Sequence, residues 1–458
     1  MATFDIRNRI HLELVELSGH VIAQRGWSAT LRADSLYRTA RLAKPDHRCR
    51  LLHGTQEIKP STPLAALDLS LGTCIQVVWI ANYTDSYKSH SNAFAAIKAN
   101  GSVVTWGRLP LYSTPLGRSP TEGVVRGCAT HGAFAAILAG GSVVTWGDSE
   151  RGADSSAVAA LLTEGVVQVV ATDMAFAALK ANGSVVTWGK GGRGGDSSSV
   201  AALLAEGVAQ VCGNVGAFVA RLSNGSVVTW GDPYFRGRFA IAPPVDTDVV
   251  HICPTSIHAF CAFKANGSVV TWGSPHFGGD SSKVAQHLTE GVVQVCGTNT
   301  ACAALMIDGS VVTWGDDAEG GDSSGVASLL TEGVIELFSN YRDFVALKAD
   351  GSVVFWGDTG SWSHEGYIVS VCGSGGAFAA IRQNGCLGVV TWGDDDQGGD
   401  SSEVAALLTE GVVHICGNEQ AFAAIKADGS VVTWGQQVVG GDSSAVAHLL
   451  KEGVTAIF

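Results

Sequence analysis

The chain has 458 residues, which exceeds one ordinary hydrophobic core and predicts either several domains or an array of repeats. Charged residues make up only 16% of it, and the formal net charge of -13 argues against a dominant nucleic-acid-binding surface. No apolar run reaches about 18 residues, so the sequence predicts no membrane span.

The chain contains 11 cysteines but no CxxC pair. Six of them occur at one position of a repeat, where a small buried apolar group fits: Cys128, Cys212, Cys253, Cys296, Cys372 and Cys416. Val170 occupies that position in another copy, which favours packing over chemistry. We therefore expect a reducing compartment, the cytoplasm or the nucleus, without zinc or disulfides. The opening MATFDIRNRIHLELVEL also lacks the apolar core of a signal peptide.

Residues 1–83 predict a compact two-layer α+β unit. The alternating run at 10–17 ends at Ser18-Gly19, and residues 20–30 can form the return strand of a hairpin. Residues 34–43, DSLYRTARLA, have helical character. Residues 50–80 predict two strands, a proline-marked loop with a helical turn, and a last strand, CIQVVWI.

Residues 50–80 resemble the second half of ubiquitin, and we assign residues 9–81 to a ubiquitin-like β-grasp domain. The resemblance implies that Leu52 and Val78 lie in an exposed apolar patch that binds protein partners. Three departures limit it, because Ala81-Asn82-Tyr83 replaces a terminal diglycine, Gln56 replaces a chain-forming lysine and His53 replaces an aromatic residue. Conjugation is therefore not implied. The alternative is a folded cap without a role in the ubiquitin pathway.

The rest of the chain is organised by the motif GSVVTWG and its variants, which occur nine times. Successive motif tryptophans are 40, 42, 42, 42, 42, 42, 36 and 42 residues apart, a period that indicates stacked supersecondary units. We predict that all nine pack in equivalent positions in a repeated core: Trp106, Trp146, Trp188, Trp230, Trp272, Trp314, Trp356, Trp392 and Trp434.

One period, at 292–333, illustrates the repeat. VVQVCG and ACAALMI are apolar strands, and SVVTWG is a third. Asn-Gly or Asp-Gly usually joins the last two, which predicts a tight hairpin with positive φ at both turn residues. In the remainder, GGDSSxVAxLLTEG, Asp-Ser-Ser before the apolar run predicts the N-cap of a short helix or helical turn of about two turns. A calcium-binding β-roll is disfavoured, because its motif recurs every nine residues.

Antiparallel units at this spacing predict an all-β β-propeller over residues 84–458. The pattern Cys296-Gly297, Asp308-Gly309 and Val312-Thr313-Trp314-Gly315 resembles the repeats of the regulator of chromosome condensation family. That family implies seven four-stranded blades. The shorter repeat and the helical link depart from it, and nine motif copies predict up to nine blades or an open array.

Three links break the pattern, at 108–120, 232–248 and 358–369. Irregular loops in an array are candidates for specific contacts. The second contains the one basic and aromatic cluster, Tyr234, Phe235, Arg236 and Arg238, as candidate contact residues. The alternative is that these are ordinary solvated loop residues.

The first copy lacks a strand of the VVQVCG type before Ala93, because residues 82–92 are polar. The last copy continues past Trp434 into Val454–Phe458, which has the character of the missing strand. We predict that Val454–Phe458 pairs with the strand around Ala93–Ile97 and closes a ring, because an open end would expose unpaired backbone groups.

No catalytic motif is present, so we expect no enzymatic activity, cofactor or metal. The sequence favours a protein-interaction scaffold, and a ubiquitin-pathway adaptor is the more specific hypothesis. A guanine nucleotide exchange factor for a small GTPase, as in the founding member of the resembled family, and a purely structural array are the alternatives. We expect a monomer that binds protein rather than nucleic acid.

Overall fold

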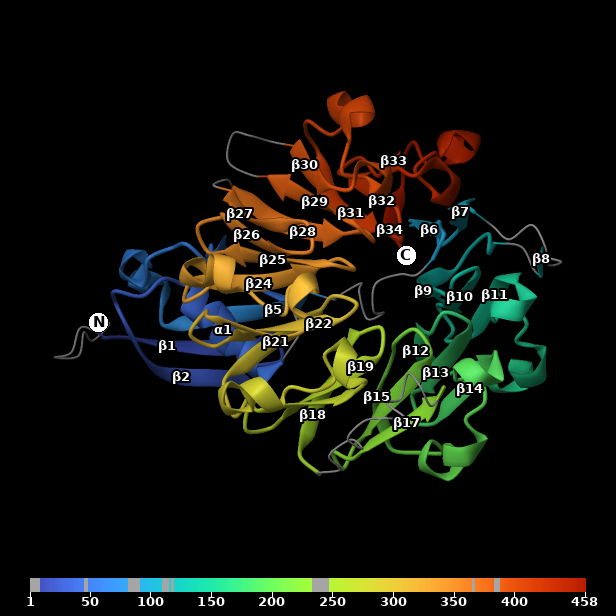
Figure 1. Ribbon diagram of the computed structural model, residues 1–458, viewed down its shortest axis with the longest axis horizontal. Coiled ribbons are helices and arrows are strands. Elements are labelled where there is room, and N and C mark those ends of the chain that lie inside the picture. Colours follow the sequence, from blue (N-terminus) through green and yellow to red (C-terminus); the bar gives the residue numbers. More distant parts are fainter. Residues whose placement is uncertain are drawn as a thin grey trace.

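The computed structural model describes residues 9–44, 48–80, 91–108, 115–116, 119–232, 247–364, 367–382 and 388–458 (Figure 1). The first unit is a five-stranded sheet with one helix. It contains β1 (Arg9–Glu16), β2 (Val21–Ser28), α1 (Asp34–Ala43), β3 (Arg48–His53), β4 (Gln56–Glu57) and β5 (Cys74–Ile80), with 3-10 turns at Leu64–Ala66 and Leu69–Leu71. The strand order is β2-β1-β5-β3-β4, and β1 runs parallel to β5.

One face of this sheet packs against α1. Leu12, Leu14 and Ile75 on the sheet and Leu36 and Ala40 on the helix are buried in one cluster. Burial alternates along β1, as strand geometry requires. The predicted helix at 34–43 and the predicted strand CIQVVWI have the predicted bounds. The boundary between the two predicted domains falls at residues 81–84, outside the described residues.

The rest of the described chain folds into nine antiparallel sheets of three or four strands, one for each motif copy. The first strands are β9 (Val124–Ala129), β12 (Val166–Ala171), β15 (Val208–Gly213), β18 (Val249–Ser256), β21 (Val292–Gly297), β24 (Val334–Ser339), β28 (Ile368–Gly373), β31 (Val412–Gly417) and β34 (Val454–Ile457). The central strands are β10 (Ala133–Leu138), β13 (Ala175–Lys180), β16 (Ala217–Leu222), β19 (Ala259–Lys264), β22 (Ala301–Met306), β25 (Asp343–Lys348), β29 (Ala377–Arg382), β32 (Ala421–Lys426) and β6 (Ala93–Lys98). The third strands carry the motif: β11 (Val143–Asp148), β14 (Val185–Gly189), β17 (Val227–Gly231), β20 (Val269–Gly273), β23 (Val311–Gly315), β26 (Val353–Gly357), β30 (Gly388–Gly393), β33 (Val431–Gly435) and β7 (Val103–Gly107). Two sheets gain a fourth strand, β8 (Pro115–Leu116) and β27 (Gly360–His364).

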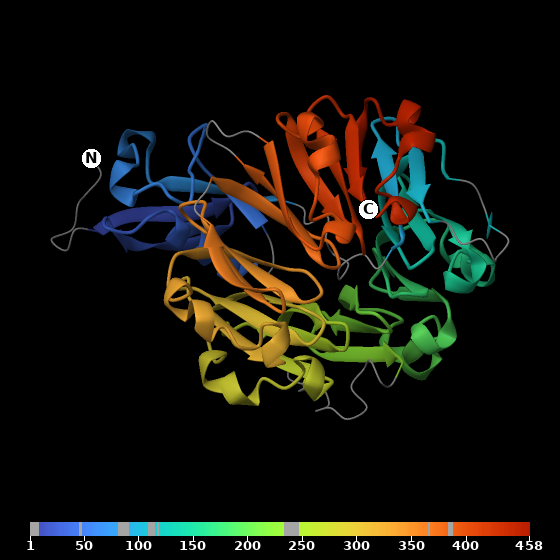
Figure 2. The same ribbon diagram turned by 45° about the horizontal axis from the view of Figure 1, so that its top comes forward.

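The sheets form a closed ring, and the fold is a β-propeller (Figure 2). The last strand, β34, pairs with β6, with Val454 opposite Lys98 and Ile457 opposite Ala96. Phe458 and Ala95 exchange two further backbone hydrogen bonds of 2.9 and 2.8 Å. The prediction that the two ends of the array share one sheet is therefore confirmed.

Each central strand is buried on both faces, because a neighbouring sheet covers each face. In β10, Ala133, Ala135 and Ile137 face the next sheet in the chain, where Phe176 and Trp188 complete the cluster. Eight tryptophans stack on a phenylalanine of the adjacent strand, with centroids 5.2–5.8 Å apart. Nine such clusters join consecutive sheets, including the last to the first.

A hydrogen bond reinforces most of these junctions. The indole N–H of Trp188 donates to the carbonyl of Gly152, 3.0 Å away, in the link that follows the preceding sheet. Five other tryptophans make the same bond to the first glycine of a Gly-Gly pair: Trp106, Trp230, Trp314, Trp356 and Trp434. The remaining three, Trp146, Trp272 and Trp392, each follow one of the three irregular links.

Close steric contacts explain why glycine occurs at the positions of this pair. Gly320, which accepts from Trp356, has φ of 95°, and a Cβ there would lie 2.6 Å from the ring of Phe344. A Cβ on Gly321 would lie 2.6 Å from the carbonyl oxygen of Asp316. The first position therefore requires glycine, whereas the second is alanine in one copy, at Ala153.

The predicted helical stretch of about two turns in the link is a six-residue 3-10 helix in six copies, at Ser156–Leu161, Ser198–Leu203, Ser282–His287, Ser324–Leu329, Ser402–Leu407 and Ser444–Leu449. A three-residue 3-10 turn precedes each, at Ser149–Arg151, Gly191–Arg193, Pro275–Phe277, Asp317–Glu319, Asp395–Gln397 and Gln437–Val439. The N-cap lies within the predicted Asp-Ser-Ser, at its first serine. Asp196 accepts from the backbone N–H of Ser198 at 2.9 Å, and the Thr187 hydroxyl donates to Ser197 at 2.9 Å.

The hairpin turns also differ from the prediction. Lys98 N–H donates to Ser102 C=O and Gly101 N–H donates to Lys98 C=O, so the loop has three residues rather than two. Gly101 is the left-handed residue, with φ of 76°. This is the three-residue hairpin loop that ends in a left-handed glycine.

We predict that Trp356→Phe destabilises the protein more than Trp272→Phe. Phenylalanine preserves the aromatic stack at both sites, but Trp356→Phe leaves the buried Gly320 carbonyl without its donor, at a cost of about 1–3 kcal/mol. The indole N–H of Trp272 has no acceptor among the described residues. Urea unfolding measures both variants, and equal losses would contradict the role given to this hydrogen bond.

The link aspartates predict a loss of stability in acid. Hydrogen bonds from the backbone N–H and hydroxyl of Ser198 lower the pKa of Asp196, and the equivalent serine bonds lower those of Asp154, Asp280, Asp322, Asp400 and Asp442. A lowered folded-state pKa stabilises the fold above the unfolded pKa of about 3.9, and this contribution is lost as the pH falls through the folded-state pKa. Thermal midpoints should therefore fall between about pH 5 and pH 2. A variant with all six changed to asparagine keeps the acceptor oxygens and should show a flatter profile. Parallel profiles would contradict this account.

Candidate protein-binding surfaces

The outer face of the N-terminal sheet carries the two predicted patch residues. Leu52 lies opposite Gln76 and Val78 lies opposite Arg50, which places both on the face away from the buried core. Both are half-buried. Arg50 and Glu57, which pair at 3.6 Å, are exposed beside them. Their use as a binding patch stays a prediction.

The other side of this unit contacts the ring through α1. Arg38 donates from Nε to the Ile307 carbonyl at 2.6 Å and from Nη1 to the Val334 carbonyl at 3.4 Å. Asp34 holds the same guanidinium at 2.7 Å. All three Arg38 contacts are buried or partly buried, so a paired charge with its hydrogen bonds contributes to the interface.

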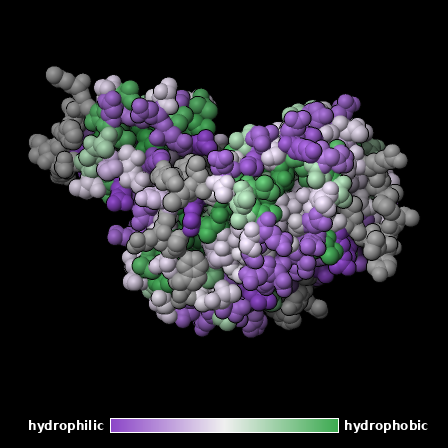
Figure 3. All heavy atoms as spheres, turned by 90° about the horizontal axis from the view of Figure 1, so that it is seen from above, coloured by the Kyte–Doolittle hydropathy of each residue, from purple (hydrophilic) through white to green (hydrophobic). Residues whose placement is uncertain are grey.

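A second arginine, one turn further along α1, completes this interface. Arg41 donates to the Ile335 carbonyl and lies 3.6 Å from the Glu336 carboxylate. Both side chains of this ion pair are nearly buried. We call the side of the ring with the turns between central and third strands the hairpin side. The N-terminal unit sits on this side, at the junction of the sheets that begin with β21 and β24. It projects from one side of the ring in Figure 3.

On the opposite side of the ring, short turns between first and central strands surround the centre. The first strands of consecutive sheets contact one another and therefore lie innermost. Backbone hydrogen bonds of 2.8–3.0 Å link consecutive turns, from His131 to Asp173, from Asp173 to Val215, and along Asn299, Tyr341, Gly375 and Glu419. His131 Nδ1 also lies 3.8 Å from Glu419 Oε1, although a whole sheet separates their sheets around the ring.

The residues of these turns differ from copy to copy, whereas the strands around them hardly change. The eight complete turns contain His131-Gly132, Asp173-Met174, Val215-Gly216, Ile257-His258, Asn299-Thr300, Tyr341-Arg342, Gly375-Gly376 and Glu419-Gln420. The sequence analysis missed this central turn cluster. Comparing the copies position by position would have found it, because variation on a constant scaffold marks residues that the core does not dictate.

Burial shifts the pKa values of several titratable groups in and next to these turns. Desolvation and, to a smaller extent, Arg193 lower the pKa of His258 to about 4 against an opposing effect of Asp232, so its ring is neutral at pH 7. That ring packs edge-on against Phe277, with centroids 4.1 Å apart. Burial also raises the pKa of the Cys128 and Cys416 thiols far above their ordinary value, which suits the packing role predicted for the repeated cysteines.

The other predicted site residues divide into two groups. The nine tryptophans lie in the junctions between sheets and belong to the core. Tyr234, Phe235, Arg236 and Arg238 lie outside the described residues, so their role as contacts stays a prediction. Across the described ranges, no cluster of three or more His, Cys, Asp or Glu side chains could hold a metal ion. None of the described helices is long and apolar enough to cross a membrane.

No family model matches the chain, and neither does any curated protein. Among solved structures, the ectodomain of the receptor kinase CR4 from Physcomitrella patens is 15% identical, covers 62% of this chain and 73% of its own, and has a TM-score of 0.37. Prp20p from Saccharomyces cerevisiae is 14% identical over 78% of this chain and 84% of its own, with a TM-score of 0.35. Human WBSCR16 is 16% identical over 61% and 90%, with a TM-score of 0.37. The fold assignment rests on the sheets and their packing.

Proposed function

We propose that this protein is a non-catalytic interaction scaffold whose β-propeller presents the central turn cluster to a protein partner. One observation carries the proposal. The strands and junctions repeat with few changes, while the turns around the centre differ in charge, size and aromatic character. A scaffold that only stacked its repeats would have no reason to vary these turns. His131, Tyr341 and Glu419 supply a cation-capable ring, an aromatic ring and a carboxylate in one small area.

The finer assignment is a nine-bladed propeller similar to the regulator of chromosome condensation family. Nine sheets of the described chain, the Asp-Gly turn before the tryptophan strand and the closure by β34 support it. The shorter repeat and the six-residue 3-10 links are the features in which this chain departs from the pattern of that family.

The N-terminal unit supports a role as a ubiquitin-pathway adaptor. Its mixed five-stranded sheet and single helix agree with a β-grasp fold. Leu52 and Val78 share the face that α1 leaves uncovered, and α1 holds the unit on the ring with its outer sheet face turned away. Such a unit would recruit a ubiquitin-binding protein while the propeller holds a second partner.

The scaffold proposal is tested by affinity isolation with quantitative mass spectrometry. A defined set of partners should be recovered with the parent. Their recovery should fall at least tenfold with a variant that carries His131→Ala, Tyr341→Ala and Glu419→Ala. Val438→Ala, at an exposed site on an outer link, is the matched control. Unchanged recovery in both variants would favour a purely structural array. Accelerated GDP release from a small GTPase by the parent would replace the proposal with an exchange-factor function.

The adaptor hypothesis has its own test with purified components. A helical ubiquitin-binding domain should bind the full chain in calorimetry, and Leu52→Ala should weaken this binding at least fivefold. Leu17→Ala is the control, because Leu17 is 66% exposed in the same unit but lies outside the proposed patch. Absence of binding by the parent, or equal weakening by both changes, would contradict a recruiting role for this patch.

A further inference from the structure

A β-bulge recurs at the same place in all nine first strands. In β12, for example, the pairing shifts between Val166 and Gln168, so Val167 has no partner across the ladder. A bulge redirects the side chain of its extra residue. The residues placed in this way are Val125, Val167, Ala209, Val250, Val293, Ile335, Val369, Val413 and Thr455.

These bulge residues form an apolar ring on the hairpin side of the propeller, and α1 covers part of it. Five of the valines are 43–60% exposed, at positions 125, 167, 250, 369 and 413. Val293 and Ile335, at the two sheets that α1 contacts, are fully and partly buried. This position of the repeat is therefore exposed in some copies and covered by a helix in others.

The covered site is a notch between two neighbouring sheets. We call Val293, Ile307, Gly309, Val334 and Ile335 the α1 notch. Arg38 occupies it, bonded to the Ile307 and Val334 carbonyls, and a Cβ on Gly309 would lie 3.0 Å from its Nη1. Both acceptors are backbone oxygens, which every copy of the repeat contains.

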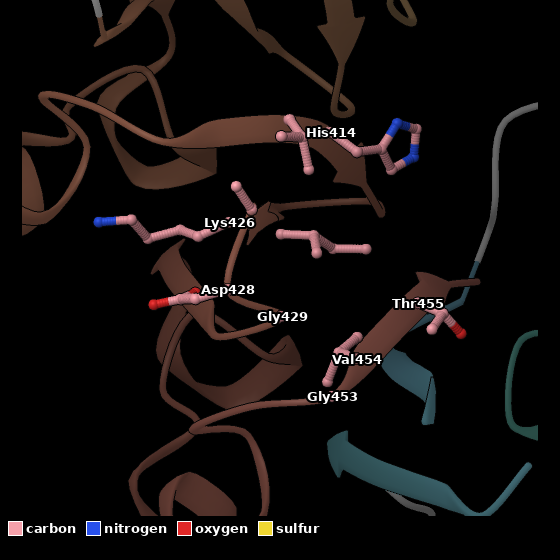
Figure 4. A pocket seen from close by; sticks show the side chains of 10 residues that line it. His414, Lys426, Asp428, Gly429, Gly453, Val454 and Thr455 are labelled. Carbon is pink, nitrogen blue, oxygen red and sulfur yellow. The ribbon is translucent and has the colours of Figure 1, made fainter. Parts of the chain in front are cut away.

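An open counterpart lies where the ring closes. We call its residues the closure notch: Val413, Ala427, Gly429, Val454 and Thr455. Each lies 120 residues after its counterpart in the α1 notch. They line a depression of about 480 Å³ (Figure 4). Val413 is 59% exposed there.

Two positions of the α1 notch differ from most other copies. Met306 stands where five other copies have lysine, and Glu336 provides the ion pair that holds Arg41 at this notch. In the closure notch these positions are Lys426 and Ala456. Lys426 donates its ε-ammonium to the Leu407 carbonyl at 3.1 Å and extends away from Val454 and Thr455 in Figure 4. The closure notch thus keeps room for one guanidinium but has alanine in place of Glu336, and the acid that lines its depression is Asp428.

We propose that the closure notch binds an α-helix of a partner protein, seated as α1 is seated, through one arginine with aliphatic neighbours. The partner chemistry comes from α1, which shows what this geometry accepts, and the net charge of -13 favours a cationic ligand. The proposal rests on the scaffold function and names a partner class for it. A second copy of this chain is a poor occupant, because its own α1 is already docked.

A fluorescent peptide with the sequence of residues 31–44 and Arg41→Ala serves as the probe, added to the full chain. It should bind in fluorescence polarisation, and Val413→Lys, which places a second cation against the arginine of the probe, should weaken binding at least tenfold. Val438→Lys, on an outer link with 61% exposure, should change affinity less than twofold. A second peptide that also carries Arg38→Ala should bind at least tenfold more weakly. Thermal midpoints near that of the parent confirm that both protein variants fold.

Three outcomes would overturn the proposal. The first is no binding of the probe to the parent, or equal weakening by Val413→Lys and Val438→Lys. The second is binding that Ile335→Lys removes and Val413→Lys does not, which would place the probe in the α1 notch. The third is self-association of the parent in analytical ultracentrifugation that Val413→Lys abolishes, which would assign the notch to a second copy. Partner recovery with the turn-cluster variant is a separate readout, so the scaffold function can stand if this proposal fails.

Discussion

The junction between neighbouring sheets is the interaction on which the rest of this structure depends. A three-stranded sheet of small residues cannot bury both of its faces alone, so each sheet needs a neighbour on either side. The aromatic pair of one sheet fills the space above the alanines of the preceding one, and a buried indole N–H must then find an acceptor. The glycine carbonyl of the preceding link provides it, and only a residue without Cβ fits there.

Closure of the ring follows from the same constraint. An open array would leave one Phe–Trp face without alanines and one alanine face without a Phe–Trp pair. Pairing of β34 with β6 removes both ends, and Trp106 then bonds to Gly440 across 334 residues of sequence. The first and last parts of the array are therefore a single sheet.

Much of this could be predicted because it is local or periodic. The tryptophan spacing indicated the sheets, and the polar stretch before Ala93 indicated where the missing strand belongs. The 3-10 links could not be told from short α-helices, since Asp-Ser-Ser begins both and the hydrogen-bond spacing is not visible in a pattern. The docking of α1 could not be predicted either, because Arg38 and Ile307 are 269 residues apart and no periodicity connects them. Variation among the turns was visible in the sequence, but it acquires meaning only when the turns are known to surround the centre.

In a ring of near-identical sheets, a segment that docks at one sheet junction must distinguish that junction from the others. Nine similar junctions would offer α1 nine similar sites, because its main acceptors are backbone carbonyls that the repeat supplies everywhere. Discrimination then has to come from the few side chains that differ. Glu336 adds the attraction for Arg41, and no other copy has an acid at that position of the repeat. Departures from the repeat, rather than the repeat itself, thus determine where this ring is bound.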